Sequence, residues 1–159
     1  MTRRRHGGVS EVMRLGLLLP LLLVAAACGS STGSPPTTPR PSRGTVGPPA
    51  AWLETRSGSH WLGFSSYCWN RAGEDVVTCA DAIAPKCSQR SMPKLSVARN
   101  EKVRAHLGYT PTEASVENAR AKLDGRTVTW RIQRAGPFVL STRGQRKNDA
   151  SYVGCGVLP

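Results

Sequence analysis

The composition of residues 28–50 constrains the possible folds of this chain more than any other sequence feature. It holds a single sizeable apolar side chain, Val46, among many Pro, Gly, Ser and Thr residues. Folding would cost this segment conformational entropy, and the segment has too little apolar surface to bury for that cost to be offset. We therefore expect residues 28–50 to form a disordered, extended linker. Only residues 51–159 then remain to build a core, which allows one small domain and excludes a two-domain enzyme or a large cofactor-binding α/β fold.

Residues 1–27 have the order of an export signal. A basic start is followed by an apolar run at 15–24, which is shorter than the ~20 residues that a membrane-spanning helix needs. The ending Ala25-Ala26-Ala27-Cys28 resembles the lipobox of bacterial lipoprotein signal peptides, although that family often has Leu where Ala25 stands. The resemblance implies that residues 1–27 are removed and that Cys28 is acylated. The lipid would anchor the protein on the extracytoplasmic face of the cell membrane. An ordinary secretory peptide is the alternative.

Four cysteines remain in the expected domain, and an even number in an exported chain indicates disulfide bonds. The segment between Cys68 and Cys79 is rich in turn residues, so a hairpin would bring these two together. Cys87 would then pair with Cys155 and tie the early part of the domain to its last strand. A zinc site is the rival interpretation, but the sequence has no Cys-x-x-Cys pair.

Short β-strand patterns separated by turn residues recur along residues 51–159. The alternation of apolar and polar residues is cleanest at 103–109. Further strands are expected at 61–69, 75–79, 95–98, 127–133, 138–140 and 152–153. Frequent short strands with turns every ~8–12 residues predict an all-β fold, a small Ig-like β-sandwich held by the disulfides. Residues 112–123 are ambiguous, because a helix capped by Thr112 and a strand near 114–116 both fit.

The stretch 149–155 is similar to the end of immunoglobulin-like domains, in which a corner Tyr precedes a Cys by two residues. Tyr152 lies three residues before Cys155, so a regular strand would place these side chains on opposite faces. The resemblance implies architecture alone. Residues 67–81, 130–131 and 149–153 also resemble small uncharacterised bacterial surface lipoproteins, and that resemblance implies no functional residue.

Two histidines, His60 and His106, are the obvious candidates for chemistry in the domain. A blue-copper site needs two His, a Cys and usually a Met, but no His follows Cys155. The sequence has no Gly-x-Ser-x-Gly motif, no phosphate-binding Gly-rich loop and no recognisable catalytic carboxylate pair. We expect no catalytic residue, no metal and no cofactor. A small envelope enzyme or metal-binding protein that uses His60 and His106 is the alternative.

Positive charge is in excess, because residues 51–159 hold 16 Lys and Arg against 9 Asp and Glu. Outside the cell the available polyanions are lipid headgroups, teichoic acids and acidic polysaccharides, and nucleic acid is not an expected partner. Arg131, Arg143 and Arg146 are the expected anion-binding residues. The sequence thus predicts a lipid-anchored extracytoplasmic protein with a non-catalytic binding or structural domain. Its partner would be an anionic envelope polymer or another envelope protein.

Overall fold

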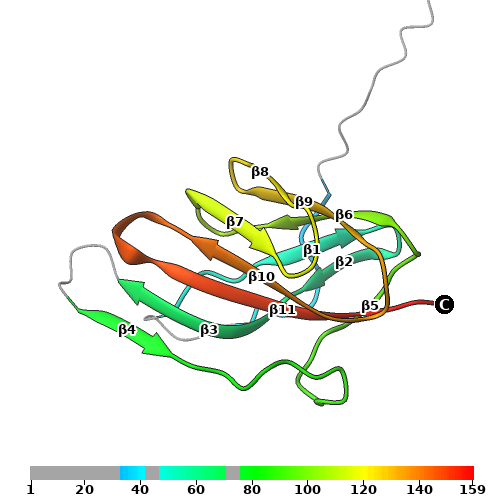
Figure 1. The fold of residues 1–159 in the computed structure, drawn as a ribbon, viewed down its shortest axis with the longest axis horizontal. Helices are drawn as coiled ribbons and strands as arrows, with labels where there is room; N and C mark the ends of the chain where they lie inside the picture. The colour runs from blue at the N-terminus through cyan, green and yellow to red at the C-terminus, as the bar shows by residue number, and fades with distance from the viewer. Residues whose placement is uncertain (1–32, 42–46, 71–75) are drawn as a thin grey trace, which may run out of the picture. The chain divides into compact units, whose positions relative to one another are not determined.

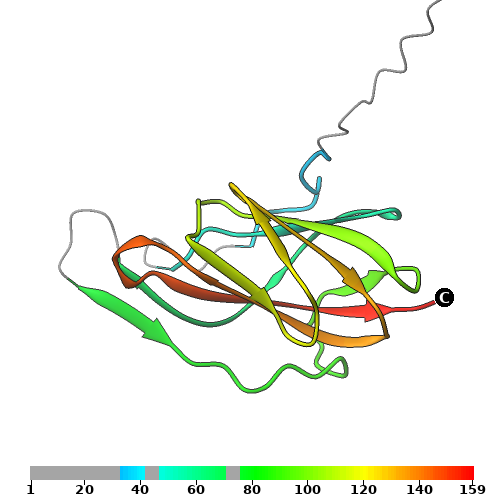
Figure 2. The same cartoon turned by 45° about the horizontal axis from the view of Figure 1, so that its top comes forward.

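The computed structural model describes residues 33–41, 47–70 and 76–159, so Cys28 and the apolar run lie outside the described residues. Within these ranges the fold is all-β, as predicted, with one 3₁₀ turn, η1 (Gln145–Lys147). The strands are β1 (Trp52–Thr55), β2 (Gly58–Trp61), β3 (Gly63–Asn70), β4 (Val77–Ala80), β5 (Lys94–Ser96), β6 (Glu101–His106), β7 (Glu113–Val116), β8 (Lys122–Asp124), β9 (Thr127–Ile132), β10 (Gly136–Arg143) and β11 (Asp149–Val157). They form two sheets that pack as a sandwich (Figures 1 and 2).

The smaller sheet has the strand order β2-β1-β6-β9-β8, and the larger sheet has the order β4-β3-β11-β10-β7. All pairings between these strands are antiparallel. The strand β5 adds a parallel pairing to the last residues of β11, beyond the point where β3 ends its pairing. The strand β11 is therefore the centre of the larger sheet, with neighbours on both sides along most of its length.

The core lies between the two sheets and follows from the alternation of side chains along the strands. In β9 the side chains of Val128, Trp130 and Ile132 are buried, while the residues between them face outward. The same alternation in β10 buries Phe138 and Leu140 against them. Each large apolar side chain buried in this way stabilises the fold by ~1.5–3 kcal/mol.

Both predicted disulfides are present. Cys68 on β3 and Cys79 on β4 lie directly opposite each other, with Cα atoms 4.1 Å apart. Cys87 pairs with Cys155 across 68 positions of sequence. Tyr152 is buried in the core, whereas Cys155 packs in a separate small cluster with Met92 and Val153, so the expected placement on opposite faces is confirmed.

Residues 112–123 form no helix. β7 pairs with β10, and β8 (Lys122–Asp124) pairs with β9, so the strand alternative is correct and the helix pattern was misleading. Ala114 and Val116 both pack on the core, which is the period-2 burial of a strand. The chain turns between the two strands at Asn118, whose φ of 59° suits Asn better than most residues. Among the described residues, no helix has the length and apolar character to cross a membrane.

Parts of the expected linker pack on the sandwich. Residues 33–41 belong to the compact unit that contains the strands. Pro48 and Ala50 are buried directly before β1. Residues 33–41 contact β2 through hydrogen bonds from Ser59 and Trp61. The folded part of the chain therefore starts earlier than residue 51.

Candidate functional site

Four serines line a shallow depression on the outer face of the larger sheet. Ser141 on β10 lies opposite Ser115 on β7 and opposite Ser151 on β11. The hydroxyl oxygens of Ser141 and Ser151 are 3.3 Å apart, within hydrogen-bond distance. Ser66 on β3 lines the same depression, after the irregularity in the pairing of β3 with β11. We call Ser66, Ser115, Ser141 and Ser151 the serine row.

The serine row faces outward because its neighbours along each strand face the core. Leu140, Thr142, Ala150 and Tyr152 are all buried, and they flank Ser141 and Ser151 on either side. Beneath the depression, the Thr142 hydroxyl donates to the Ala150 carbonyl at 2.9 Å and bonds the hydroxyl of Tyr109. Burial raises the pKa of Tyr109 above its ordinary value. The floor of the depression is therefore a hydrogen-bonded part of the core, which holds the serines in fixed positions.

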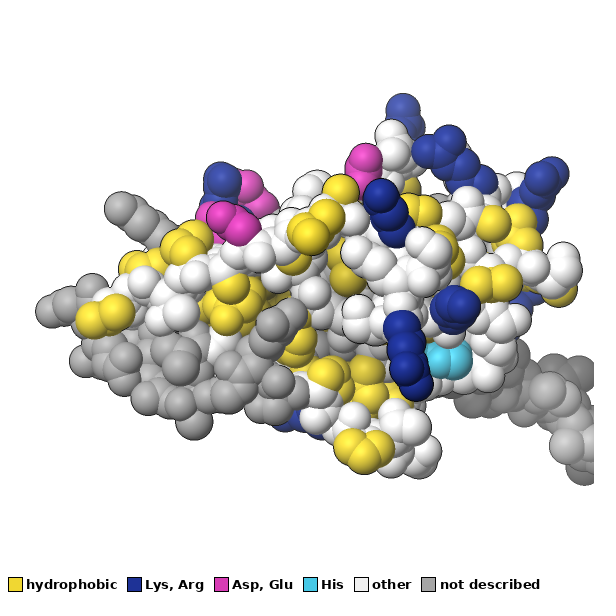
Figure 3. All heavy atoms as spheres, turned by 90° about the horizontal axis from the view of Figure 1, so that it is seen from below, with side chains coloured by type: hydrophobic (Ala, Val, Ile, Leu, Met, Phe, Trp, Pro, Cys, Tyr) yellow, Lys and Arg dark blue, Asp and Glu magenta, His cyan; other side chains and the backbone are white. Residues whose placement is uncertain are grey.

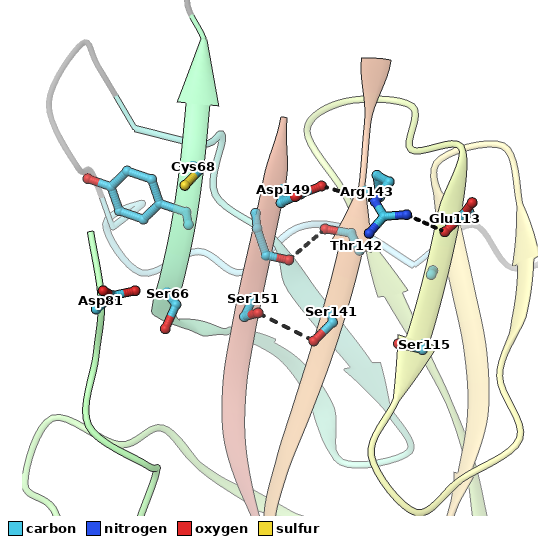
Figure 4. Close-up of a pocket in the computed structure, with 13 residues that line it drawn as sticks. Ser66, Cys68, Asp81, Glu113, Ser115, Ser141, Thr142, Arg143, Asp149 and Ser151 are labelled. Atoms are coloured by element: carbon cyan, nitrogen blue, oxygen red, sulfur yellow. Dashed lines mark hydrogen bonds and ion pairs between the residues drawn. The ribbon is translucent and has the colours of Figure 1, made fainter. Parts of the chain in front are cut away.

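A row of charged residues runs beside the serine row, across the same strands. Arg143 on β10 lies opposite both Glu113 on β7 and Asp149 on β11. Its guanidinium is 3.4 Å from a Glu113 carboxylate oxygen and 3.5 Å from an Asp149 carboxylate oxygen (Figure 4). All three side chains are more than half exposed, so these ion pairs contribute little to stability. They place two carboxylates beside the hydroxyls.

The depression has a volume of about 590 Å³ and extends from β7 to the segment after β4. Asp81 lines its far end, on the same side as Ser66 in Figure 4. The charged residues in the described lining are Asp81, Glu113, Asp149 and Arg143, so carboxylates outnumber cations. This lining contains no His or Lys. The depression can therefore exchange hydrogen bonds with a ligand and accept bonds from its hydroxyl or amine groups.

The three arginines predicted to bind an anion do not come together. Arg131 lies on β9 and faces outward from the smaller sheet, while Arg143 faces outward from the larger sheet. Arg146 lies in η1, between β10 and β11, with a φ of 57°. The outward faces of β9 and β10 lie on opposite sides of the core. The sequence alone does not show to which sheet each strand belongs.

The two histidines also point to different faces of one sheet. His60 on β2 lies opposite Leu53, which is fully buried, and its Nε2 is buried without a hydrogen-bond partner. His106 on β6 lies on the outer face, where its ring stacks on Trp52 with centroids 3.8 Å apart. Its Nε2 is 3.1 Å from a carboxylate oxygen of Glu54. Within the described ranges, no three His, Cys, Asp or Glu side chains converge as metal ligands would.

Basic side chains do gather on the outer face of the smaller sheet. Lys102 on β6 lies directly opposite Arg131 on β9, and Arg104 lies two residues further along β6 on the same face. The guanidinium of Arg104 is 3.5 Å from Glu54, and Arg131 donates to the Asn100 carbonyl at 2.8 Å. Figure 3 shows one side of the molecule, on which Lys and Arg gather at one end. We call Lys102, Arg104 and Arg131 the basic cluster.

Sequence reasoning missed the serine row. The available signal was the place of each serine in the polar phase of a strand, as in Leu140-Ser141-Thr142 and Ala150-Ser151-Tyr152. The pairing of the strands, which aligns these positions, was not available from the pattern. No family model, no curated protein and no solved structure matches this chain.

Proposed function

We propose that this chain is a lipid-anchored extracytoplasmic protein whose β-sandwich binds a hydroxyl-rich envelope polymer, a glycan, on the serine row. The observation that carries the proposal is the alignment of serine hydroxyls across neighbouring strands, with carboxylates beside them. A hydroxyl both donates and accepts hydrogen bonds, and a carboxylate accepts them, which matches the repeated hydroxyls of a sugar chain. The depression is open and spans several strands, so an extended chain can lie in it.

Binding fits this lining better than catalysis. A serine nucleophile needs a base within hydrogen-bond reach, and the described lining offers no His or Lys for that purpose. Both histidines of the domain belong to the smaller sheet. The carboxylates are exposed, and Glu113 and Asp149 share Arg143 as an ion-pair partner. The alternative of an enzyme that uses His60 and His106 together gains no support, because their side chains point to opposite faces.

A neutral glycan suits the depression better than a polyanion. Three carboxylates lie in the described lining against one guanidinium, and that guanidinium is already paired with two of them. A polyanion would meet net negative charge there. The order of charges and small residues before Cys28 supports the anchor, which places the domain among envelope polymers.

The test is retention of the full-length protein on immobilised peptidoglycan and on a neutral α-glucan. We expect Ser115→Ala and Ser151→Ala together to weaken retention at least fivefold on whichever polymer binds, because two aligned hydroxyls are lost. The matched control is Thr127→Ala with Thr129→Ala, which removes two outward hydroxyls from the smaller sheet. Equal retention of both double variants and the unaltered protein would contradict the proposal.

A second candidate function is the contact with an anionic envelope polymer, now assigned to the basic cluster. The observation that favours it is the direct pairing of Lys102 with Arg131, since like charges opposite each other across strands are destabilising unless an anion lies between them. Retention of the Cys28→Ala protein, which lacks the predicted lipid, on anionic vesicles should fall steadily as salt screens the charges. Lys102→Gln with Arg131→Gln should lower this retention, whereas the control Arg143→Gln should not. Salt-independent retention, or equal losses in both variants, would contradict this assignment.

A further inference from the structure

The Ser/Thr/Pro-rich segment 33–41 lies on the outer face of β1 and β2, drawn in blue in Figures 1 and 2. The Ser59 hydroxyl donates to the carbonyl of Ser34 at 2.6 Å. The indole Nε1–H of Trp61 donates to the carbonyl of Thr38 at 2.9 Å. Both donors belong to β2 and lie two residues apart, so they project from the same face of the strand.

Each of the two accepted carbonyls belongs to a residue directly before a proline. The segment reads Gly33-Ser-Pro-Pro-Thr-Thr-Pro-Arg-Pro41, so Ser34 precedes Pro35 and Thr38 precedes Pro39. A proline has no N–H and biases the preceding residue toward an extended conformation. Such a segment cannot join a β-ladder through those positions, but its carbonyls stay free to accept bonds from side chains. Because its conformation is largely preset, it loses little entropy on binding.

A third contact lies at the start of the segment. The side chain of Glu54 on β1 is held by His106 at 3.1 Å and by Arg104 at 3.5 Å. Gly33 packs so closely on this side chain that a Cβ at residue 33 would lie 2.6 Å from Cδ of Glu54. Glycine is therefore the residue that fits there without displacing Glu54. On the same face, Trp52 lies opposite Trp61 and opposite His106, on which its ring stacks.

We propose that this face, the tryptophan face made of Glu54, Ser59 and Trp61, is a recognition site for an extended Ser-Pro/Thr-Pro peptide. Its occupant is residues 33–41 of the same chain. Recognition depends on two hydrogen-bond donors, the Ser59 hydroxyl and the Trp61 indole N–H, which bind the carbonyls of the residues directly before prolines. Aromatic surfaces bind polyproline segments in a similar way. Covalent attachment keeps the occupant at a high effective concentration, so weak individual contacts suffice. The site lies on the smaller sheet and is independent of the serine row.

The test follows the indole N–H of Trp61 by NMR in the full-length protein, with Trp61→Phe used to assign its resonance. We expect Pro35→Ala with Pro39→Ala to release the segment, to shift this resonance, and to speed exchange of its proton with solvent at least tenfold. The control Thr37→Ala changes an exposed residue whose carbonyl is not one of the two accepted ones, and it should leave both measurements unchanged.

A peptide supplied in trans completes the test. The peptide Gly-Ser-Pro-Pro-Thr-Thr-Pro-Arg-Pro, added at millimolar concentration to the Pro35→Ala/Pro39→Ala protein, should return the Trp61 resonance toward its original position. The same peptide with alanine at the two prolines should not. An unchanged Trp61 resonance in the double variant, or equal effects of the two peptides, would overturn the proposal.

Discussion

The phenolic hydroxyl of Tyr152 donates a hydrogen bond of 2.8 Å to the backbone carbonyl of Pro49, across 103 positions of sequence. The ring of Tyr152 is fully buried in the core, and it packs near Phe64 with centroids 5.7 Å apart. The Tyr152 side chain on the last strand therefore packs in the core and also hydrogen-bonds the segment that leads into β1. A buried carbonyl that loses its partner costs about 1–3 kcal/mol.

Replacement of Tyr152 by Phe should lower the free energy of unfolding by about 1–2 kcal/mol, because the ring still fills the core while the Pro49 carbonyl loses its donor. Urea unfolding measures this loss as a lower midpoint with an unchanged slope. An unchanged midpoint would show that the hydrogen bond contributes nothing to stability.

Stability should also fall at alkaline pH. Burial raises the pKa of Tyr152 and the pKa of Tyr109 above that of an unfolded Tyr, which ionises near pH ~10. Above that pH the unfolded chain loses protons that the folded chain keeps, so the free energy of unfolding decreases as pH rises. Urea midpoints should be insensitive to these two groups below pH ~10 and should decline above it. The Tyr152→Phe variant should show a shallower decline, and an equal slope in both proteins would contradict this account.

The two disulfides should differ in their contribution. The Cys87–Cys155 bridge spans 68 positions and the Cys68–Cys79 bridge spans 11. Chain-entropy estimates for such loops are ~4 and ~3 kcal/mol. Replacing Cys87 and Cys155 by Ser should therefore destabilise the protein more than replacing Cys68 and Cys79. Thermal unfolding of the two double variants compares them directly, and the reverse order would refute the loop-length explanation.

Gly154 should tolerate no side chain. A Cβ at this position on β11 would lie 2.6 Å from Cζ of Phe138 and 2.8 Å from Cδ1 of Leu95. Overpacking of this kind costs ~1–3 kcal/mol. Gly154→Ala should lower the urea midpoint accordingly, while Ser151→Ala, an outward change on the same strand, should leave it nearly unchanged. Equal midpoints for the two variants would mean that the core yields easily around residue 154.

Cys28→Ala should release the protein from membranes, because the predicted acylation site is lost while the export signal remains. Fractionation of cells and incorporation of a labelled fatty acid measure the two consequences separately. A variant that stays with the membrane fraction and still carries label would show that the lipid is attached elsewhere.

The architecture was predictable from the sequence because its signals are local. Alternation at Val103, Ala105 and Leu107 marks a half-buried strand, and the four cysteines of residues 51–159, an even number in a chain predicted to be exported, predict the disulfides. Residues 112–123 were ambiguous because Val116, Ala119 and Leu123 fit a helical spacing as well as two short strands. Pairing with β10 and β9 decided between them, and such long-range pairing leaves no local signature.

The candidate sites were less predictable, because they depend on which strands are neighbours. The serine row exists only because β7, β10 and β11 align Ser115, Ser141 and Ser151 in one register. The same register pairs Arg143 with two carboxylates, which the excess of positive charge did not suggest. The docking of residues 33–41 was missed because low hydrophobicity indicates disorder, whereas hydrogen bonds to carbonyls before prolines require no apolar burial.

If Cys28 carries a lipid, the contact of Gly33 with Glu54 limits how far the β-sandwich can lie from the membrane. With a lipid on Cys28, only the four residues 29–32 separate the anchor from the docked segment, and the five Cα–Cα steps from Cys28 to Gly33 span roughly 17 Å at most. Release of residues 33–41 would lengthen this tether to the 18 residues between Cys28 and Gly47, and the 19 Cα–Cα steps would span roughly 65 Å at most. A few hydrogen bonds on the tryptophan face would then decide whether the serine row samples a thin layer next to the bilayer or a much deeper zone of the wall.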